Sequence, residues 1–315
     1  MKSITKAGLA AGTALLLAAC SGGGATTTAD QQPTGAVTAT SSPSPTPTPT
    51  PTPTRPPYGP VLARYVDPVN AALAKLTSAT TTDAISTVLQ EVAGAATTAG
   101  SGLGYADEPA SVTTAQRQLV TALTQLATDL TKVRTDIKKK TLCAVPSALA
   151  RIGESEGLKA VPAALAQMTA AGYPTTFAPP QFPQLQTRSL DNGAMVREGR
   201  LRGSGVFKVD NGGSADAVVS LAQKGKSIHS VYVGKGKKAS IEGIEDGTYE
   251  IYFSGGVDWD SNLKAFTQNC DFSKFDDTLE FETGRTYTSW SITLQPTVGG
   301  NAKTSDVDEN TFPTP

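Results

Sequence analysis

Apolar residues recur at every third or fourth position across residues 60–172, which is the spacing of one face of an α-helix. The pattern predicts a first helix over 61–76 and a second that begins near Asp83, a residue suited to cap it. We expect Pro68 to kink or interrupt the first helix, because proline lacks the amide hydrogen that a helix interior uses. Residues 101–104, Ser-Gly-Leu-Gly, are expected to form the loop that follows the second helix.

The third predicted helix is the most regular. Asp107 is suited to cap it and Pro109 to form its first turn. Its apolar face consists of Val112, Leu119, Leu123, Leu126, Leu130, Val133 and Ile137. Lysines at 138–140 place positive charge at the end of the helix, where it is favoured. This face predicts packing against neighbouring helices, and self-association as a coiled coil is the alternative.

An alanine-rich stretch at 145–171 predicts a fourth helical segment. We expect it to be interrupted near Gly153–Gly157 and at Pro162, since glycine and proline disfavour a helix interior. The four segments together predict a helical bundle with short connections.

Beyond residue 202 the apolar pattern changes to strict alternation, which is typical of strands. The clearest strand segments are 206–209, 217–221, 228–233, 248–253, 279–281 and 288–294. In the last segment Trp290, Ile292 and Leu294 share one face, with serine and threonine on the other. Short strands at this spacing predict an antiparallel β-sandwich of about seven strands.

The first twenty residues have the layout of a secretory leader. Their apolar run, 7–19, is shorter than the about 20 residues that span a bilayer. The run ends in Leu17-Ala18-Ala19-Cys20, which resembles the lipobox of bacterial lipoproteins. The resemblance implies cleavage between Ala19 and Cys20, a diacylglyceryl thioether on Cys20, and palmitate anchoring at the extracytoplasmic face of the cell membrane. An ordinary cleaved leader with a coincidental cysteine is the alternative.

Residues 21–59 are rich in threonine, proline, serine and glycine, with Thr-Pro repeats over 46–54. Such a composition cannot bury a core, and alternating prolines favour an extended, semi-rigid chain. We therefore expect a disordered linker that serves as a spacer. It is either O-glycosylated or an unmodified tether.

These patterns predict an α+β chain with an N-terminal all-α helical bundle followed by an all-β antiparallel sandwich. The expected boundaries are 1–20 for the leader, 21–59 for the Pro/Thr-rich linker, 60–172 for the bundle, 173–202 for a second linker, 203–296 for the sandwich and 297–315 for a tail.

Composition and charge limit the classes of partner that the protein is expected to bind. The chain has 315 residues, of which 38% are hydrophobic, enough for two domains beside its non-globular segments. It carries 27 basic and 28 acidic residues, and loss of the two leader lysines would leave 25 basic residues. Without a positive excess, we expect no nucleic-acid partner.

Cys143 and Cys270 remain once Cys20 is assigned to the lipid. Outside the cytosol disulfides persist, so the two cysteines could form a bridge between the predicted domains. Two buried free thiols, each acting as a small apolar side chain, are the alternative.

Little in the chain points to catalysis. His229 is the only histidine, and it lies in a predicted strand beside Ser227 and Ser230, where a solvated histidine is the simplest interpretation. The adjacent acids Asp276 and Asp277 would face opposite sides of a strand and make a poor acid/base pair. One histidine and two distant cysteines cannot form a zinc site, and no phosphate loop or dinucleotide fingerprint occurs. We expect no cofactor, metal or catalytic residue.

Asp258, Trp259 and Asp260 are the candidate ligand contacts. The oxygen side chains at 258–262 begin like a calcium loop, but Leu263 stands where that loop needs glycine, so an Asx-rich turn is the simpler interpretation. Trp259 could stack on a sugar ring or anchor a partner. The alternative, which we favour, is that its ring folds over the core.

Residues 217–221 and 244–251, the latter reading Ile-Glu-Asp-Gly-Thr-Tyr-Glu-Ile, resemble the prealbumin-like sandwich modules of secreted peptidases and surface proteins. The region 203–313 is also similar to a domain that recurs in actinobacterial surface and membrane proteins of unknown function. This resemblance implies a place at the cell surface and no activity.

The expected function is a non-enzymatic, lipid-anchored surface protein that binds or presents a cell-wall glycan or a protein partner. The alternative is a carbohydrate-binding surface module that uses Trp259. A hydrolase with carboxylates supplied by both domains is a third, less favoured hypothesis.

Overall fold

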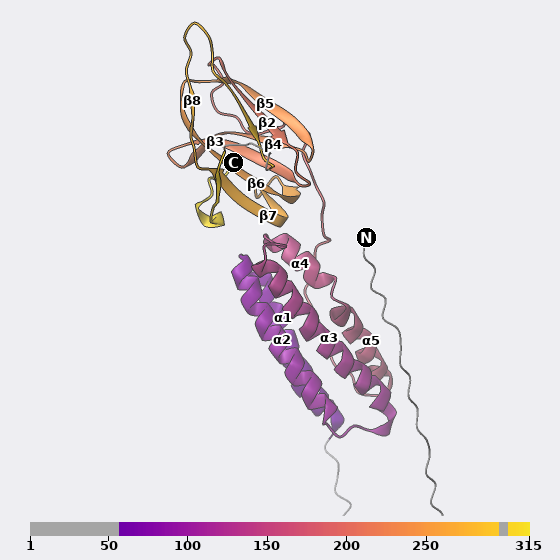
Figure 1. Ribbon diagram of the computed structural model, residues 1–315. Coiled ribbons are helices and arrows are strands. Elements are labelled where there is room, and N and C mark those ends of the chain that lie inside the picture. The colour runs from indigo at the N-terminus through magenta and orange to yellow at the C-terminus, as the bar shows by residue number, and fades with distance from the viewer. Residues whose placement is uncertain (1–56, 296–301) are drawn as a thin grey trace, which may run out of the picture. The chain divides into compact units, whose positions relative to one another are not determined.

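The computed structural model describes residues 57–295 and 302–315, so Cys20, the rest of the predicted leader and most of the predicted spacer lie outside it. Helices fill the first part of the described chain and strands the second, in agreement with the α+β prediction (Figure 1). The helices are α1 (Tyr58–Ala74), α2 (Thr82–Gly104), α3 (Thr113–Lys138), α4 (Val145–Gly153) and α5 (Glu156–Ala170). Among the described residues, no helix has both the length and the apolar content to cross a membrane.

Helix α2 differs from its prediction at both ends. Its cap is Thr81, whose hydroxyl accepts a hydrogen bond from the backbone N–H of Ala84 at 3.1 Å, and not Asp83. The loop prediction at 101–104 is wrong, because the helix continues to the end of this segment. Gly102 allows the ring of Tyr65 in α1 to lie against the backbone, since a Cβ atom there would come within 2.1 Å of that ring. Close packing on α1 therefore extends α2 through a glycine-rich sequence.

The apolar face of α3 is the prediction that the structure confirms most fully. Every residue of that face is buried, from Val112 to Ile137, and the helix packs on α2 and α5. The apolar face of α3 is therefore covered by other helices of the same chain. The predicted start of the helix is wrong: a short 3-10 turn, Ala110–Val112, precedes α3, whose N-cap position is Val112 and not Asp107.

Two prolines in helix interiors do not end their helices. Pro68 lies within α1, and Pro162 lies within α5. Buried neighbours, Val69 in α1 and Val161 in α5, hold each helix on the shared core, and this burial offsets the lost backbone hydrogen bond. The break predicted near Gly153–Gly157 is present, because α4 ends at Gly153 and α5 begins at Glu156.

Helix α5 begins directly against the backbone of α3. The Asp129 carboxylate of α3 accepts hydrogen bonds from the Ser155 hydroxyl at 2.7 Å and from the Gly157 backbone N–H at 3.1 Å. A Cβ atom at Gly157 would lie 2.1 Å from the backbone nitrogen of Leu126. Only glycine therefore permits this approach between the two helices.

Residues 173–182, which belong to the predicted linker 173–202, pack along the helices. Tyr173 packs edge-on against Tyr58 of α1, with ring centroids 5.2 Å apart. The Asn70 side chain of α1 donates to the Thr176 carbonyl at 2.7 Å and accepts from the Ala178 N–H at 3.1 Å. Phe182 lies against Gly153 at the end of α4. This proline-containing segment is thus held along the helices by its aromatic side chains and its backbone.

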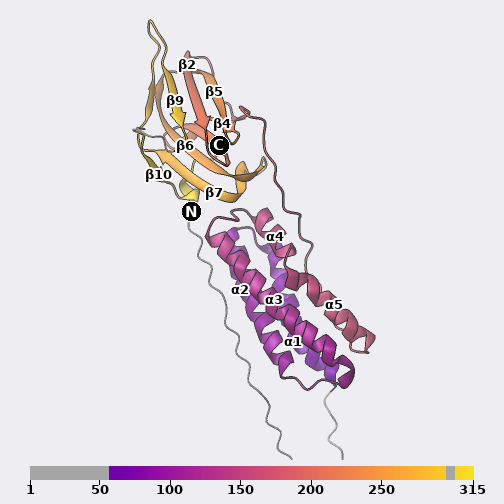
Figure 2. The ribbon, with the colours of Figure 1, turned by 45° about the vertical axis from the view of Figure 1, so that its right-hand side comes forward.

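Ten strands make up the sheet part of the described chain. They are β1 (Met195–Arg197), β2 (Gly205–Asn211), β3 (Asp216–Gln223), β4 (Lys226–Val233), β5 (Lys237–Ile244), β6 (Gly247–Asp260), β7 (Ala265–Phe275), β8 (Leu279–Phe281), β9 (Ser289–Thr293) and β10 (Thr304–Asp306). One sheet has the order β1-β4-β3-β6-β7-β10, with β8 paired to β6, and a second has the order β5-β2-β9 (Figure 2).

The expectation of purely antiparallel sheets is wrong for one pair. Strand β9 runs parallel to β2, with Val206 opposite Ser289 and Asp210 opposite Thr293. Strand β8, which precedes β9, pairs with β6 in the other sheet. Because the chain crosses from one sheet to the other between β8 and β9, β9 joins β2 by a crossover and not by a hairpin.

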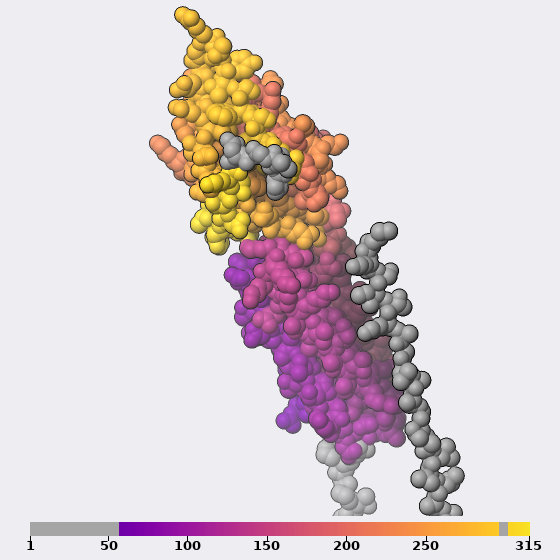
Figure 3. All heavy atoms as spheres, in the orientation of Figure 1, coloured from indigo at the N-terminus to yellow at the C-terminus, as the bar shows by residue number. Residues whose placement is uncertain are grey.

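Several strands lie where the sequence predicted none. Strands β5 and β7 were missed, β1 lies in the predicted second linker, and β10 lies in the predicted tail. The predicted tail also packs on the sheet, because Phe312 contacts the rings of Tyr252 and Phe272 edge-on. Figure 3 shows these yellow C-terminal residues seated on the sheet part.

The segment 140–143 pairs with β7. The backbone N–H of Cys143 donates to the Thr267 carbonyl at 2.9 Å, and the N–H of Cys270 donates to the Lys140 carbonyl at 3.0 Å. Cys143 and Cys270 form a disulfide, with Cα atoms 6.2 Å apart, in the usual range for such a bridge. Of the two alternatives that the sequence left open, the structure contains the disulfide. We call this set of bonds the 140–143/β7 junction.

Gly157→Ala should destabilise the protein by about 1–3 kcal/mol, because the added methyl group forces the backbones of α3 and α5 apart. Gly94→Ala is the matched control. It lies inside α2 with no atom within 4 Å of a new Cβ, so it should stabilise by about 0.5–1 kcal/mol. Urea unfolding measures both changes. Equal effects of the two substitutions would contradict the close approach.

Cys143→Ser combined with Cys270→Ser should lower the free energy of unfolding by up to about 5 kcal/mol in the loop-entropy model, because the bridge spans 127 residues. Chemical denaturation of the oxidised wild type, the reduced wild type and the double variant provides the measurement. The reduced wild type should match the variant. Equal unfolding curves for all three would contradict the stabilisation expected from the bridge.

Candidate functional site

A cavity of about 390 Å³ lies between β8 and β9. The two strands are consecutive but belong to different sheets. At one end they are held together, because the Thr288 hydroxyl bonds the backbone of Glu282 and the Trp290 indole N–H donates to the Glu280 carbonyl at 2.8 Å. Away from that end, β8 pairs with β6 in one sheet and β9 pairs with β2 in the other. We call the space between them the Trp290 cavity.

The Trp290 cavity combines an apolar floor with a polar rim. Its apolar residues include Ile251, Phe275, Leu279 and Ile292, and its polar residues are Asp277, Thr278, Ser291 and Thr293. Ile251 and Ile292 are buried, whereas Asp277, Thr278 and Ser291 are exposed. Within the described residues, none of the four polar side chains has a hydrogen bond or an ion pair. They are therefore available to a ligand.

Trp290 is the exposed aromatic residue of this cavity, and the sequence pattern did not identify it as a site. The face that it shares with Ile292 and Leu294 is only partly covered: Ile292 is buried, but Trp290 is 39% exposed. The local sequence holds no signal for this exposure, because the serines on both sides of Trp290 lie on the opposite face of the strand.

Trp259, the aromatic residue that the sequence did single out, is not available to a ligand. Its side chain is 2% exposed and lies in β6, where the sequence predicted an Asx-rich turn. The rings of Tyr232 and Phe266 pack edge-on against it, with centroids 6.1 and 5.1 Å away. The prediction of a sugar-stacking Trp259 is wrong, and the alternative of a core residue is correct.

Asp258 and Asp260 are both bound by Arg188 and are not free ligand contacts. The Arg188 guanidinium donates to both carboxylate oxygens of Asp258 at 2.8 Å and lies 3.0 Å from an Asp260 oxygen. Burial acts to raise the pKa of Asp258, but hydrogen bonds from Arg188 and Thr267 outweigh it and lower the pKa to about 2. Arg188 lies in the predicted second linker, so this ion pair fastens that segment to β6.

The calcium-loop hypothesis finds no support at this position. The Asp260 carboxylate accepts hydrogen bonds from the backbone N–H groups of Asn262 and Leu263, in an Asx-type turn. In the part of the chain that the structure describes, no three His, Cys, Asp or Glu side chains gather closely enough to hold a metal ion.

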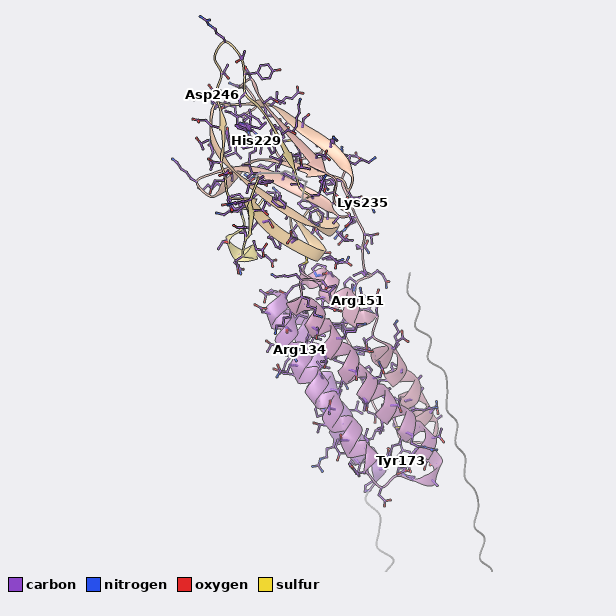
Figure 4. All side chains as sticks on the ribbon, in the orientation of Figure 1. Arg134, Arg151, Tyr173, His229, Lys235 and Asp246 are labelled. Carbon is purple, nitrogen blue, oxygen red and sulfur yellow. A yellow bond between two sulfur atoms is a disulfide. The ribbon has the colours of Figure 1, made fainter. Side chains whose placement is uncertain are left out.

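His229 is buried, which corrects the expectation of a solvated histidine. It is 1% exposed and lies among the strands of the sheet part (Figure 4). Its Nδ1 accepts the backbone N–H of Gly199 at 3.2 Å, and its Nε2 has no partner within the described residues. Burial lowers the pKa of His229, and the charges of Glu245 and Glu198 oppose this shift. The imidazole therefore favours the neutral form.

The serines near His229 form no catalytic arrangement with it. Ser230 bonds the hydroxyls of Ser220 and Ser227 at 2.8 and 2.7 Å, within the buried interior. No hydrogen bond among the described residues joins any of these hydroxyls to the imidazole. The cluster satisfies buried polar groups and lacks the serine–histidine bond that nucleophilic catalysis needs.

A larger groove of about 710 Å³ runs between α3 and α5. Alanines at 122, 160, 163 and 164 line it, and long side chains such as Arg117 and Gln125 border it. It is a shallow surface of small apolar residues bordered by long polar side chains, and it contains no aromatic ring. The Trp290 cavity is therefore the better candidate site.

No protein-family model, curated protein or solved structure matches the chain. The assignment of a function consequently depends on the residues themselves.

His229→Gln should reduce the loss of stability between pH 6.5 and pH 5. Because burial lowers the pKa of His229, the unfolded chain takes up its proton first as the pH falls. The stability present above pH 6.5 is then lost as the pH falls through the folded-state pKa, by about 1.4 kcal/mol for each unit between the two values. Thermal unfolding at several pH values measures the slope for both proteins. The same slope in the variant would contradict a neutral buried imidazole.

Proposed function

We propose that the chain is a lipid-anchored protein of the cell surface that binds a partner outside the cytoplasm and catalyses no reaction. The observation that carries this proposal is the sequence Leu17-Ala18-Ala19-Cys20 at the end of a short apolar run. The membrane is then its first partner, through the lipid on Cys20, and a wall glycan or a surface protein is the second.

The disulfide between Cys143 and Cys270 supports an extracytoplasmic location. Disulfides persist in oxidising compartments and are rare in the cytosol. The leader and the bridge are independent features of the sequence, and both favour the same side of the membrane.

The finer architecture is also part of the proposal. We infer that the five helices form a bundle and that the two sheets form a sandwich of the prealbumin-like kind, as in actinobacterial surface proteins. The shared apolar core of α1 to α5 supports the bundle. The core that includes Phe207 of β2 and Val219 of β3, from the two sheets, supports the sandwich.

Binding, and not catalysis, is the activity that the described side chains favour. The single histidine is buried in the sheet part, and the carboxylates of Asp258 and Asp260 are engaged by Arg188. The Trp290 cavity, in contrast, presents uncommitted hydroxyls and one uncommitted carboxylate beside an exposed ring. Such a surface suits recognition of a ligand without a reaction.

Cys20→Ser tests the anchor in the cells that produce the protein. Loss of the thioether should abolish labelling by a palmitate analogue and move the protein out of the washed membrane fraction, or leave it unprocessed. Ser21→Ala is the control, since it keeps the cysteine and should leave labelling and fractionation unchanged. A Cys20→Ser protein that stays processed and membrane-bound would overturn the proposal.

A further inference from the structure

We propose that the Trp290 cavity binds a sugar ring of an uncharged glycan. This inference rests on the proposed surface function, because the ligand has to be met outside the cytoplasm. It assigns the carbohydrate site to residues on β9 and before β8, away from Trp259.

The first argument is the state of the Trp290 ring. The ring is 39% exposed and lines the cavity, and its indole N–H is committed to the Glu280 carbonyl at 2.8 Å. This hydrogen bond holds the ring in one orientation. A pyranose ring carries mostly C–H groups on its flat faces, so an oriented aromatic surface can stack against it without displacing a polar partner.

The second argument is the rim of the cavity. The Asp277 carboxylate and the Thr278 hydroxyl, from the segment before β8, line the same cavity as Trp290, and Ser291 and Thr293 border it from the opposite face of β9. A carboxylate accepts hydrogen bonds strongly, and hydroxyls both donate and accept, which is the set of groups that sugar hydroxyls require. Among the described strands β9 pairs only with β2, so its outer edge also presents backbone N–H and C=O groups.

The third argument is size and charge. A volume of about 390 Å³ lies at the small end of ligand sites, which are about 300–1,000 Å³, and suits one or two rings of a chain. Asp277 lines the cavity, and Glu280 and Glu282 lie on the strand and connection beside it. Acidic groups disfavour an anionic ligand, so the structure assigns uncharged sugars and not phosphate polymers.

The test is isothermal titration of the lipidated full chain in detergent. The probes are uncharged oligosaccharides built from hexoses, pentoses or N-acetylhexosamines, with poly(glycerol phosphate) as the anionic probe. At least one uncharged oligosaccharide should bind. Trp290→Ala should weaken that binding by about ten-fold or more, the loss expected for an aromatic contact.

Matched variants distinguish loss of the binding site from a general effect of a substitution on the protein. Asp277→Asn keeps the shape of the rim and should weaken binding several-fold, which provides a test if Trp290→Ala disturbs β9. Tyr287→Ala removes an exposed ring, and Asp191→Asn an exposed acid, neither of which lines the cavity. Both controls should retain wild-type affinity.

Three results would overturn the sugar assignment: no oligosaccharide binds, only poly(glycerol phosphate) binds, or neither Trp290→Ala nor Asp277→Asn changes the affinity. Each of these leaves the anchor untouched, because palmitate labelling and its loss in Cys20→Ser are measured separately. Failure of the labelling would instead overturn the surface location and leave the titration result standing.

Discussion

The 140–143/β7 junction is the constraint on which the sheet part of this protein depends most. A disulfide and backbone hydrogen bonds fix the start of β7 to the segment that follows α3. Strand β7 in turn carries Phe266, which packs on Trp259, and it pairs with both β6 and β10. Its conformation is unusual at this point, since Asn269 adopts a positive φ of 50°. Several long-range contacts therefore converge on a few residues.

The chemical groups of the sheet part divide into two kinds. His229, Ser230 and Asp258 are buried, and each forms at least one hydrogen bond with a group of another segment or of the same strand. These bonds hold the strands and the segment around Arg188 in place. Trp290 and the polar residues around it are left open, because β8 and β9 end in different sheets. Residues whose type suggests catalysis or binding therefore have a structural role where the fold buries them. They are available for binding where the two sheets separate.

Wrong local predictions share a cause, which is that long-range packing outweighed a local preference. Glycine at 102 suggests a loop, but in α2 it makes room for Tyr65. Pro162 suggests a break, but burial of Val161 holds α5 on its core. The acids around Trp259 suggest a loop, but Arg188, 70 residues away from Asp258, neutralises them within a strand. Asn70 likewise binds the segment around Thr176, which the sequence pattern predicts to be a free linker.

The sequence by itself determined that a helical part precedes a strand part, and it determined the buried face of α3 and the break before α5, because periodicity and glycine act over a few residues. It also contains the lipobox-like leader, which is read as a linear motif. Only the tertiary structure decided that β2 pairs with β9 in parallel, that Cys143 meets Cys270, and that Trp290 and not Trp259 is exposed. An alternating pattern defines two faces of a strand, but which face is covered depends on elements far away in the chain.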